Sequence, residues 1–435
     1  MRSSVQPVAL GAASPLTRGL SAGWQRLLSA VDAGDDAPLP DAFSSVTGDL
    51  ERLGVPDELV RGVRVGLARG AWDDAADAFG RCRDRDVGFY LGPMRAIEGA
   101  PLSTGLLLLE RHPAASEVAA LVERAAVEIG DRVFGFPCDF HGRHVEYYDV
   151  VLAAGPFAAA GARYIALFTP FYLGGFSDLP RQQLLRRSVL FHNVARARFA
   201  HLTRPAAERH LRLGGALPRF LGAAEPEIDR AIALWLSLHE LIHGSGPLPL
   251  FQTAVDKLGL GMTYAGIEEA RVDMTVWLLL ERCSDVWGEL GGITQDIILA
   301  ERLLRSARRG LPGHPDGGAL QSDSDSEAGA IWLSLLLRRA GATPTEAGLL
   351  DVDPSRARSA IRAFLDDVYE REGDAASAPS RGEEILTTFA DRARAELFGG
   401  ASAGPAYPPT AARFLDALEA PLSLRLTFPR GPSVA

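Results

Sequence analysis

Residues Ala231 to Pro247 read AIALWLSLHELIHGSGP and contain the pattern His-Glu-x-x-His, formed by His239, Glu240 and His243. Residues four positions apart lie on one face of an α-helix, so the two imidazoles can bind the same metal ion. Glu240 directly follows the first histidine, where a carboxylate can act as general base toward a metal-bound water. This stretch therefore predicts a helix that carries a catalytic metal centre.

The residues before the motif predict the helix itself. Pro226 suits its first turn, and an apolar stripe at spacings of three and four residues then runs through Ile228, Ile232, Trp235 and Leu236. His239 and His243 continue this stripe, so the face that packs inward also carries the histidines. Gly244 is expected to end the helix, as a glycine in the left-handed conformation often does. The alternative is a chance match with two buried, hydrogen-bonded histidines, and the helical placement favours metal binding.

A third metal ligand is expected from GIEEARVDM, residues 266–274. A catalytic zinc site usually has three protein ligands and one open position. Glu269 is the best candidate for the third ligand, and Asp273, one turn further along the same helical face, can accept a hydrogen bond from a ligand imidazole. The alternative is a solvated acidic patch paired with Arg271. The position of this segment just after the two histidines favours the metal site.

Two motifs together, HELIHGSGPL and EEARVD, resemble those of the dipeptidyl peptidase III family of zinc peptidases. That family carries motifs of the HELLGHGSGK and EECRAE types. This chain has one residue fewer between its histidines, and Ala270, Val272 and Asp273 replace the family's Cys, Ala and final Glu. The resemblance covers roughly residues 139–273, with weaker similarity to about residue 341.

The resemblance implies the cofactor and the roles of several residues. It implies a Zn2+ ion bound by His239, His243 and Glu269. It also implies that Glu240 is the general base and that Glu268 and Asp273 support the ligands from behind. The family's Glu-x-Tyr is similar to residues 146–148, so Tyr148 is a candidate hydrogen-bond donor to an oxyanion. The alternative for Tyr148 is a tyrosine at the start of a strand with its hydroxyl group on water.

Part of the family's substrate-binding chemistry is missing. Aligned on Pro170, Phe168 and Phe171 stand where the family has asparagines that hold the amino terminus of a peptide. A phenylalanine cannot accept a hydrogen bond from an ammonium group, and it makes the wall of the site apolar. The helix expected to begin near Ser324 also lacks the histidine that supports the transition state in the family. These replacements predict a small apolar substrate and argue against a true dipeptidyl peptidase.

A second group of polar residues lies at 139–144, which read DFHGRH. Its histidines are three residues apart, and such a pair is more typical of a surface loop than of a second metal site. Arg143 or His144 is a candidate contact for an anionic part of a substrate.

Composition limits the partners and the location. The net charge is −10 with no basic stretch, which argues against nucleic acid, and no apolar run is long enough to span a membrane. Three widely spaced cysteines (Cys82, Cys138 and Cys283) form no metal or redox pattern, and the N-terminus lacks the apolar core of a signal peptide. We therefore expect a cytoplasmic protein with a small-molecule or short peptide substrate. The sequence leaves the oligomeric state open.

The chain of 435 residues is long enough for two or three domains. We predict an α+β, mostly helical fold of two lobes with a cleft. Residues 1–178, joined by a returning tail at 405–435, form a helical plus β lobe. Its spacing is helical from about residue 41 to 128, including Leu106 to Leu109, and a small sheet or part of a barrel follows. Residues 179–404 form a helical zinc-binding lobe, with a loop at 310–327.

Three functions fit these features. The first is a zinc metallohydrolase in which Glu240 activates water for attack on an amide or peptide-like carbonyl. The second uses the same site for an isomerase, lyase or aldol-type reaction on a small hydrophobic carbonyl compound, with Glu240 as the base. The third is a binding protein with a structural zinc ion, which would require a fourth protein ligand.

Overall fold

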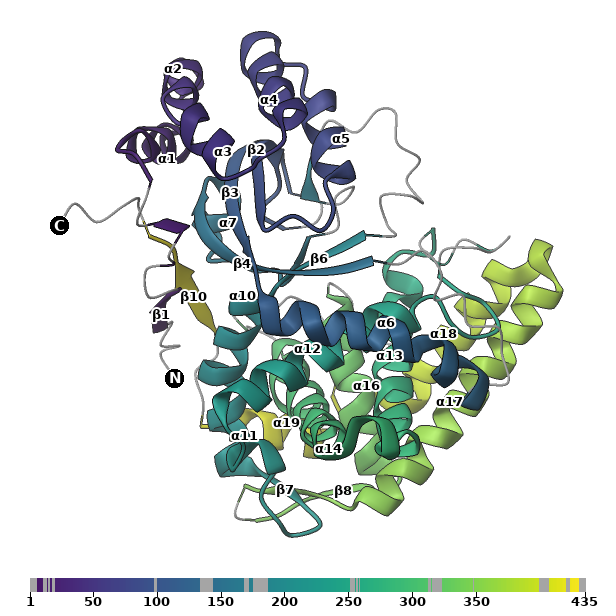
Figure 1. Ribbon diagram of the computed structural model, residues 1–435. Coiled ribbons are helices and arrows are strands. Elements are labelled where there is room, and N and C mark those ends of the chain that lie inside the picture. The colour runs from purple at the N-terminus through teal and green to yellow at the C-terminus, as the bar shows by residue number, and fades with distance from the viewer. Residues whose placement is uncertain are drawn as a thin grey trace. The chain divides into compact units, whose positions relative to one another are not determined.

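The structure is a computed structural model of residues 1–435 (Figure 1). It describes residues 6–10, 14, 16–17, 20–97, 100–133, 144–167, 172–174, 187–250, 255, 257, 259–311, 314, 323–346, 348–398, 407–419 and 423–429. The chain divides into two compact units, each described here by itself. The sheet unit comprises residues 6–117, 143–197 and 424–435; the helical unit comprises residues 1–5, 118–142 and 198–423. The sequence predicted a boundary between two lobes at residues 178 and 179, and this boundary stays a prediction.

The sheet unit begins with short helices. They are α1 (Gly23–Ala33), α2 (Leu39–Ser44), α3 (Thr47–Arg52), α4 (Asp57–Arg69) and α5 (Asp73–Arg81). Each buries residues at helical spacing; in α4 these include Leu59, Val60 and Val63. Helices α1, α4 and α5 pack against strands β2 and β3 (Figure 1).

A mixed five-stranded sheet forms the centre of this unit. Its strands are β2 (Val87–Met94), β3 (Ser103–Arg111), β4 (His144–Ala154), β5 (Ala166–Leu167) and β6 (Arg187–Phe191). They are ordered β2-β3-β4-β6-β5, and β4 and β6 are the parallel pair. In the part of the chain that the structure describes, this ladder does not close into a barrel. A separate parallel pair joins β1 (Gln6–Ala9) to β10 (Leu424–Thr427).

The helical interpretation of Leu106 to Leu109 is wrong, because these four buried leucines form the middle of β3. A strand buried on both faces has a continuous apolar run, and periodicity alone does not distinguish such a run from a buried helix.

The helical unit contains most of the remaining elements. Its main helices are α11 (Arg204–His210), α12 (Glu225–Ile242), α13 (Met262–Arg282), α14 (Ser284–Ala300), α16 (Ser324–Arg338), α17 (Pro354–Ser377), α18 (Gly382–Phe398) and α19 (Pro409–Asp416). Two π-helical turns, η2 (Phe199–Thr203) and η4 (Glu301–Ser306), adjoin α11 and α14. The three-stranded sheet β7-β9-β8 consists of Leu211–Leu213, Leu350–Val352 and Ala342–Pro344.

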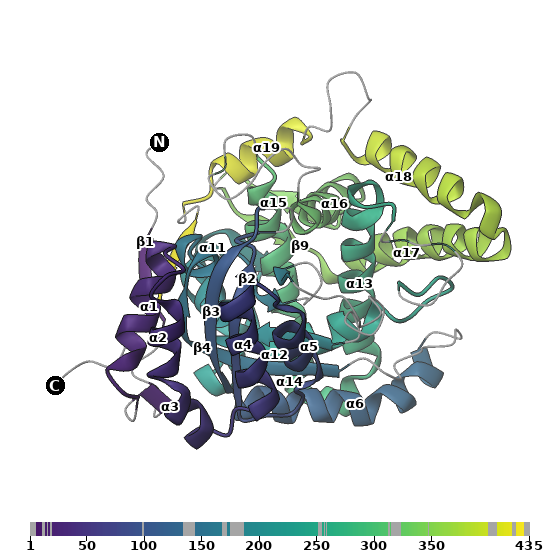
Figure 2. The same cartoon turned by 90° about the horizontal axis from the view of Figure 1, so that it is seen from above.

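Shorter elements and connections complete the description. They are α6 (Pro113–Val133), α7 (Pro156–Ala159), α10 (His192–Arg198), α15 (Ala307–Arg309), and the 3-10 turns η3 (Arg219–Leu221) and η6 (Pro379–Arg381). Helix α13 is central in the helical unit, since it packs against α12, α14, α16, α17 and α18 (Figure 2). The predicted α+β, mostly helical class is confirmed.

Gly329 on α16 marks the tightest packing around the π-turn η4. A Cβ atom at this position would lie 2.4 Å from the backbone nitrogen of Ala307 and 2.8 Å from the backbone oxygen of Arg302. Backbone atoms cannot move aside cheaply, so we expect Gly329→Ala to lower the free energy of unfolding by about 3 kcal/mol. Denaturant unfolding of the purified variant measures this.

The control is Gly373→Ala inside α17, where the new Cβ would meet only the Pro247 Cβ at 4.0 Å. This change should stabilise by about 0.5–1 kcal/mol, because alanine favours a helix interior over glycine. Equal effects of the two substitutions would contradict the packing described for α16.

Candidate metal centre

Helix α12 positions both histidines of the motif. Its first turn is held by the Glu227 carboxylate, which accepts a hydrogen bond of 2.8 Å from the backbone N–H of Ala224. The helix ends at Ile242, directly before His243. His243 is the C-cap, so Gly244 directly follows the helix end, as predicted, and Gly246, with φ of 96°, is the glycine of this segment in the left-handed region.

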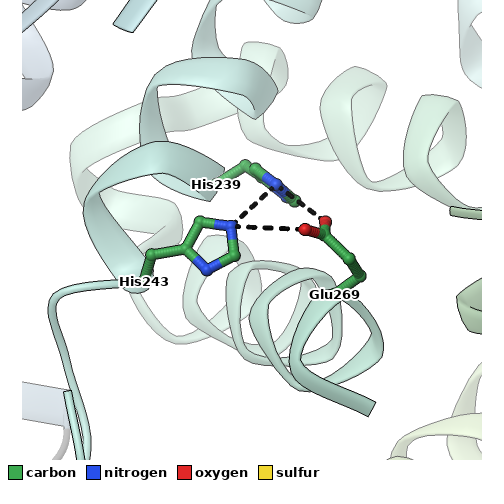
Figure 3. Close-up of side chains that lie close together, drawn as sticks. All are labelled: His239, His243 and Glu269. Atoms are coloured by element: carbon green, nitrogen blue, oxygen red, sulfur yellow. Dashed lines mark hydrogen bonds and ion pairs between the residues drawn. The ribbon is translucent and has the colours of Figure 1, made fainter. Parts of the chain in front are cut away.

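The side chains of His239, His243 and Glu269 converge on one point (Figure 3). The two Nε2 atoms lie 3.2 Å apart. Oε2 of Glu269 lies 3.2 Å from Nε2 of His239, and Oε1 of Glu269 lies 3.7 Å from Nε2 of His243. A tetrahedral zinc ion with bonds of about 2.0–2.1 Å separates its ligand atoms by about 3.3 Å. The three donors therefore have the spacing of three corners of such a site, with α13 supplying the carboxylate.

Each histidine of the motif has a carboxylate next to its Nδ1 atom, on the side of the ring away from the other ligands. Nδ1 of His239 lies 2.8 Å from Asp273 Oδ1, and Nδ1 of His243 lies 3.0 Å from Glu268 Oε1. An ionised carboxylate only accepts hydrogen bonds, so each Nδ1 carries a proton and each Nε2 is the atom that faces the Glu269 carboxylate. The two Nε2 atoms and the Glu269 carboxylate then face one another, and a positive charge between them, from a proton or a metal ion, stabilises this arrangement.

The electrostatics of His239 indicate the same need for positive charge. Burial of the ring would lower the pKa of His239, but the carboxylates of Asp273 and Glu269 raise it well above its ordinary value. A proton on the ring would satisfy this need in part, and a divalent metal ion would satisfy it more fully. The residues present thus fit a zinc ion.

Asp273 is held by three donors. Besides His239, it accepts a hydrogen bond of 2.7 Å from Trp235 Nε1 on Oδ1 and one from Arg302 Nε on Oδ2. Burial opposes ionisation of this carboxyl group, but Arg302 and His239 outweigh it and lower the pKa of Asp273 to about 2. The group that supports His239 is therefore ionised at neutral pH.

Glu268 lies in a buried network of four charges. It accepts hydrogen bonds from Lys257 Nζ at 2.8 Å and from Arg271 at 2.6 and 2.9 Å. Lys257 also lies 2.7 Å from Glu372. Burial would raise the pKa of Glu268, but Arg271 and Lys257 lower it well below its usual range. This network ionises the carboxylate that supports His243.

Sequence reasoning missed Lys257, Glu372 and Arg302. One signal existed for Lys257. It is the only lysine in a chain of 435 residues, whose other basic residues are all Arg or His.

Glu240 lies next to His239 on α12 and is 4% exposed. Among the described residues, no further His, Cys, Asp or Glu joins the group of three ligands. The described residues thus supply three protein donors, which is typical of a catalytic zinc site and not of a structural one. That Glu240 acts as the base stays a prediction.

Tyr148 belongs to the sheet unit, and its hydroxyl group is engaged there. It donates toward the carbonyl oxygen of Arg85 at 3.1 Å and toward Glu146 Oε1 at 3.2 Å. Burial, with a smaller contribution from Glu146, raises the pKa of Tyr148 above its ordinary value. The hydroxyl group is therefore a neutral donor. Its predicted role toward an oxyanion stays a prediction.

The sheet unit holds a second group with metal-ligating atoms, formed by Asp84, His144 and Glu146. His144 Nε2 lies 3.2 Å from Asp84 Oδ1. However, Glu146 already accepts a hydrogen bond of 2.6 Å from the Asp84 N–H and is ion-paired with buried Arg187. Both Glu146 oxygens are thus occupied, and we assign no metal here. Residues 139–143 lie outside the described part of the chain.

Three further sequence-based points concern the surroundings of the site. Phe168 and Phe171 lie outside the described residues, so their place in a substrate pocket stays a prediction. Helix α16 begins at Ser324 and contains no histidine. Within the described ranges, none of the helices has the length and apolar character needed to cross a membrane.

Comparisons with known proteins support the fold. The sequence matches no family model and no curated protein. The structure is similar to that of DPP III from Caldithrix abyssi, with 14% identity, a TM-score of 0.59, and coverage of 90% of this chain and 71% of that chain. It is also similar to dipeptidyl-peptidase III from Corallococcus sp. strain EGB, with 14% identity, a TM-score of 0.56, and coverage of 91% and 68%. At this identity the likeness concerns the fold alone, and the chain has a dipeptidyl peptidase III-like fold.

Proposed function

We propose that this protein is a divergent member of the dipeptidyl peptidase III family and a zinc-dependent metallohydrolase. The observation that carries the proposal is the convergence of His239, His243 and Glu269, with a carboxylate behind each imidazole. A bound zinc ion would polarise a substrate carbonyl and acidify a water molecule. Glu240 is the group that takes the proton of that water and passes it to the leaving nitrogen.

The substrate is an amide or peptide-like compound that is small and apolar. Phe168 and Phe171 replace the asparagines that hold a peptide's amino terminus in the family, which supports an apolar wall. A role of Tyr148 toward the oxyanion rests only on the resemblance of residues 146–148 to the family's Glu-x-Tyr. The acidic net charge of −10 supports a partner other than nucleic acid, and the cytoplasm is the expected location.

The test is zinc analysis of the purified protein, followed by a panel of hydrophobic amides, N-blocked peptides and free peptides. We expect one zinc ion per chain and hydrolysis of blocked or small amides in preference to dipeptide release from free peptides. Absence of bound zinc after loading would overturn the metal site. Efficient dipeptide release from free peptides would overturn the proposed substrate class.

A second candidate function is isomerase, lyase or aldol-type chemistry at the same site. The absence of a histidine from α16 favours it, because the family's hydrolysis uses a histidine from that helix. Reactions of this type need only a polarised carbonyl and a base, which Glu240 supplies. Turnover in oxygen-18 water separates the two functions, since hydrolysis must place the label in the acid product.

A further inference from the structure

A buried arginine, Arg302, lies against the metal centre without being one of its ligands. Its side chain is 3% exposed, and its three nitrogens point to three carboxylates. Nε donates to Asp273, Nη1 donates to Asp325 at 2.6 Å, and Nη2 lies 3.8 Å from Oε2 of Glu269. This Glu269 oxygen is also the one that lies 3.2 Å from Nε2 of His239. A full positive charge thus lies beside both a ligand carboxylate and the carboxylate behind a ligand imidazole.

The π-turn η4 accounts for the burial of this arginine. Glu301, Arg302, Leu303 and Leu304 are consecutive and each at most 3% exposed, although a regular helix with one buried face would expose some of them. The wider π-helical turn directs Glu301 to Thr203 and Arg302 to Asp273. Such turns are frequent at functional sites.

We infer that Arg302 is an internal counter-ion of the metal site. It balances the charge of Asp273 and Glu269 before metal binds, and it lowers the affinity of the site for a divalent cation. Because Arg302 shares the negative charge of Asp273 through Oδ2, the carboxylate pulls less strongly on the Nδ1–H of His239. That imidazole is then a weaker donor and leaves more positive charge on a bound ion. Arg302 therefore acts through its neighbours to favour polarisation of a substrate carbonyl. This inference rests on the proposed zinc site.

Magnitudes decide the expected direction when Arg302 is removed. Loss of an orienting partner weakens metal binding by about 10- to 100-fold. Arg302 lies 3.8 Å from a ligand oxygen and therefore further from the ion itself. A unit charge and a divalent ion about 8 Å apart, at an effective dielectric constant of about 20, change a binding constant about a thousandfold. Removal of the positive charge is the larger effect, and it acts in the opposite direction. We therefore expect Arg302→Met to bind zinc about tenfold more tightly than the native chain, or tighter still.

The experiment measures zinc affinity by competition with a chromophoric chelator in the native chain and in Arg302→Met, Arg302→Lys and Arg305→Met. Arg302→Lys keeps the charge but not the three-way geometry, so it should bind zinc no more tightly than the native chain. Arg305→Met is the matched control. Arg305 lies on the same π-turn and pairs with Glu301, which in the described part of the chain bonds to Thr203 and to neither histidine. The zinc affinity of Arg305→Met should therefore stay within about threefold of native.

Arg302→Met leaves Asp273 and Asp325 without the guanidinium of Arg302. The test still holds if the metal-free variant unfolds. In that case added zinc should restore its cooperative thermal unfolding, and it should raise the unfolding midpoint of Arg302→Met by more than that of Arg305→Met, because the tighter binder gains more. The inference would be overturned if Arg302→Met bound zinc no more tightly than the native chain, or if Arg302→Lys also bound it more tightly. It would also be overturned if zinc failed to restore an unfolded Arg302→Met. A native chain that binds no zinc would overturn the proposed function and this inference together.

Discussion

Replacing Glu240 with glutamine should leave zinc bound and lower kcat/KM by about 10²- to 10⁴-fold, the range that general acid–base groups contribute. Glutamine has nearly the same shape but cannot accept a proton from water. Glu240 is not among the three converging ligands, so the substitution does not remove a metal donor. Zinc content and steady-state kinetics on the best amide of the panel measure the two effects separately.

Two variants make this result specific to Glu240. His243→Ala removes a ligand and should lose zinc and activity together. Glu281→Gln, on the far end of α13, changes a carboxylate that is paired with Arg358 and should leave both quantities unchanged. Full activity of Glu240→Gln, or loss of its zinc, would show that this carboxylate is not the base.

The convergence of the candidate ligands was predictable from sequence where the geometry is local. His239 and His243 are four residues apart on one helix, and helical spacing alone places their side chains together. Glu269 and Asp273 are likewise one turn apart on α13, so identifying one of them locates the other. What spacing leaves undetermined is which imidazole each carboxylate supports; the structure pairs Asp273 with His239 and Glu268 with His243.

The charges behind these carboxylates were not predictable in the same way. Arg302 is 29 positions from Asp273 in sequence, and it reaches that carboxylate from a π-turn that no local pattern indicates. Glu372 comes from α17, which packs on α13, and it meets Lys257, which lies in the segment that precedes α13. Such pairings depend on how helices pack, and packing is decided by the whole core. The same limit explains Leu106 to Leu109, whose run of leucines fits a buried strand as well as a helix.

The buried network around Lys257 makes the second large prediction. The side chains of Lys257 and Glu372 are fully buried, and their charged atoms lie 2.7 Å apart. Lys257→Met removes one cation and leaves Glu372 with Arg271, 3.5 Å away, as its remaining ion-pair partner in the network. Removing one partner of a buried ion pair costs about 3–5 kcal/mol, because the other charge stays buried. We expect Lys257→Met to lower the free energy of unfolding by that amount.

The double variant Lys257→Met with Glu372→Gln separates charge from packing. It removes the cation and one anion together, and Glu268 keeps its two hydrogen bonds from Arg271. Replacement of both members of a buried pair is often close to neutral. The double variant should therefore recover most of the stability lost in Lys257→Met, as measured by denaturant unfolding of the metal-free protein. If the double variant is less stable than Lys257→Met, the lysine supports the fold by filling space, and the charge balance behind His243 does not depend on it.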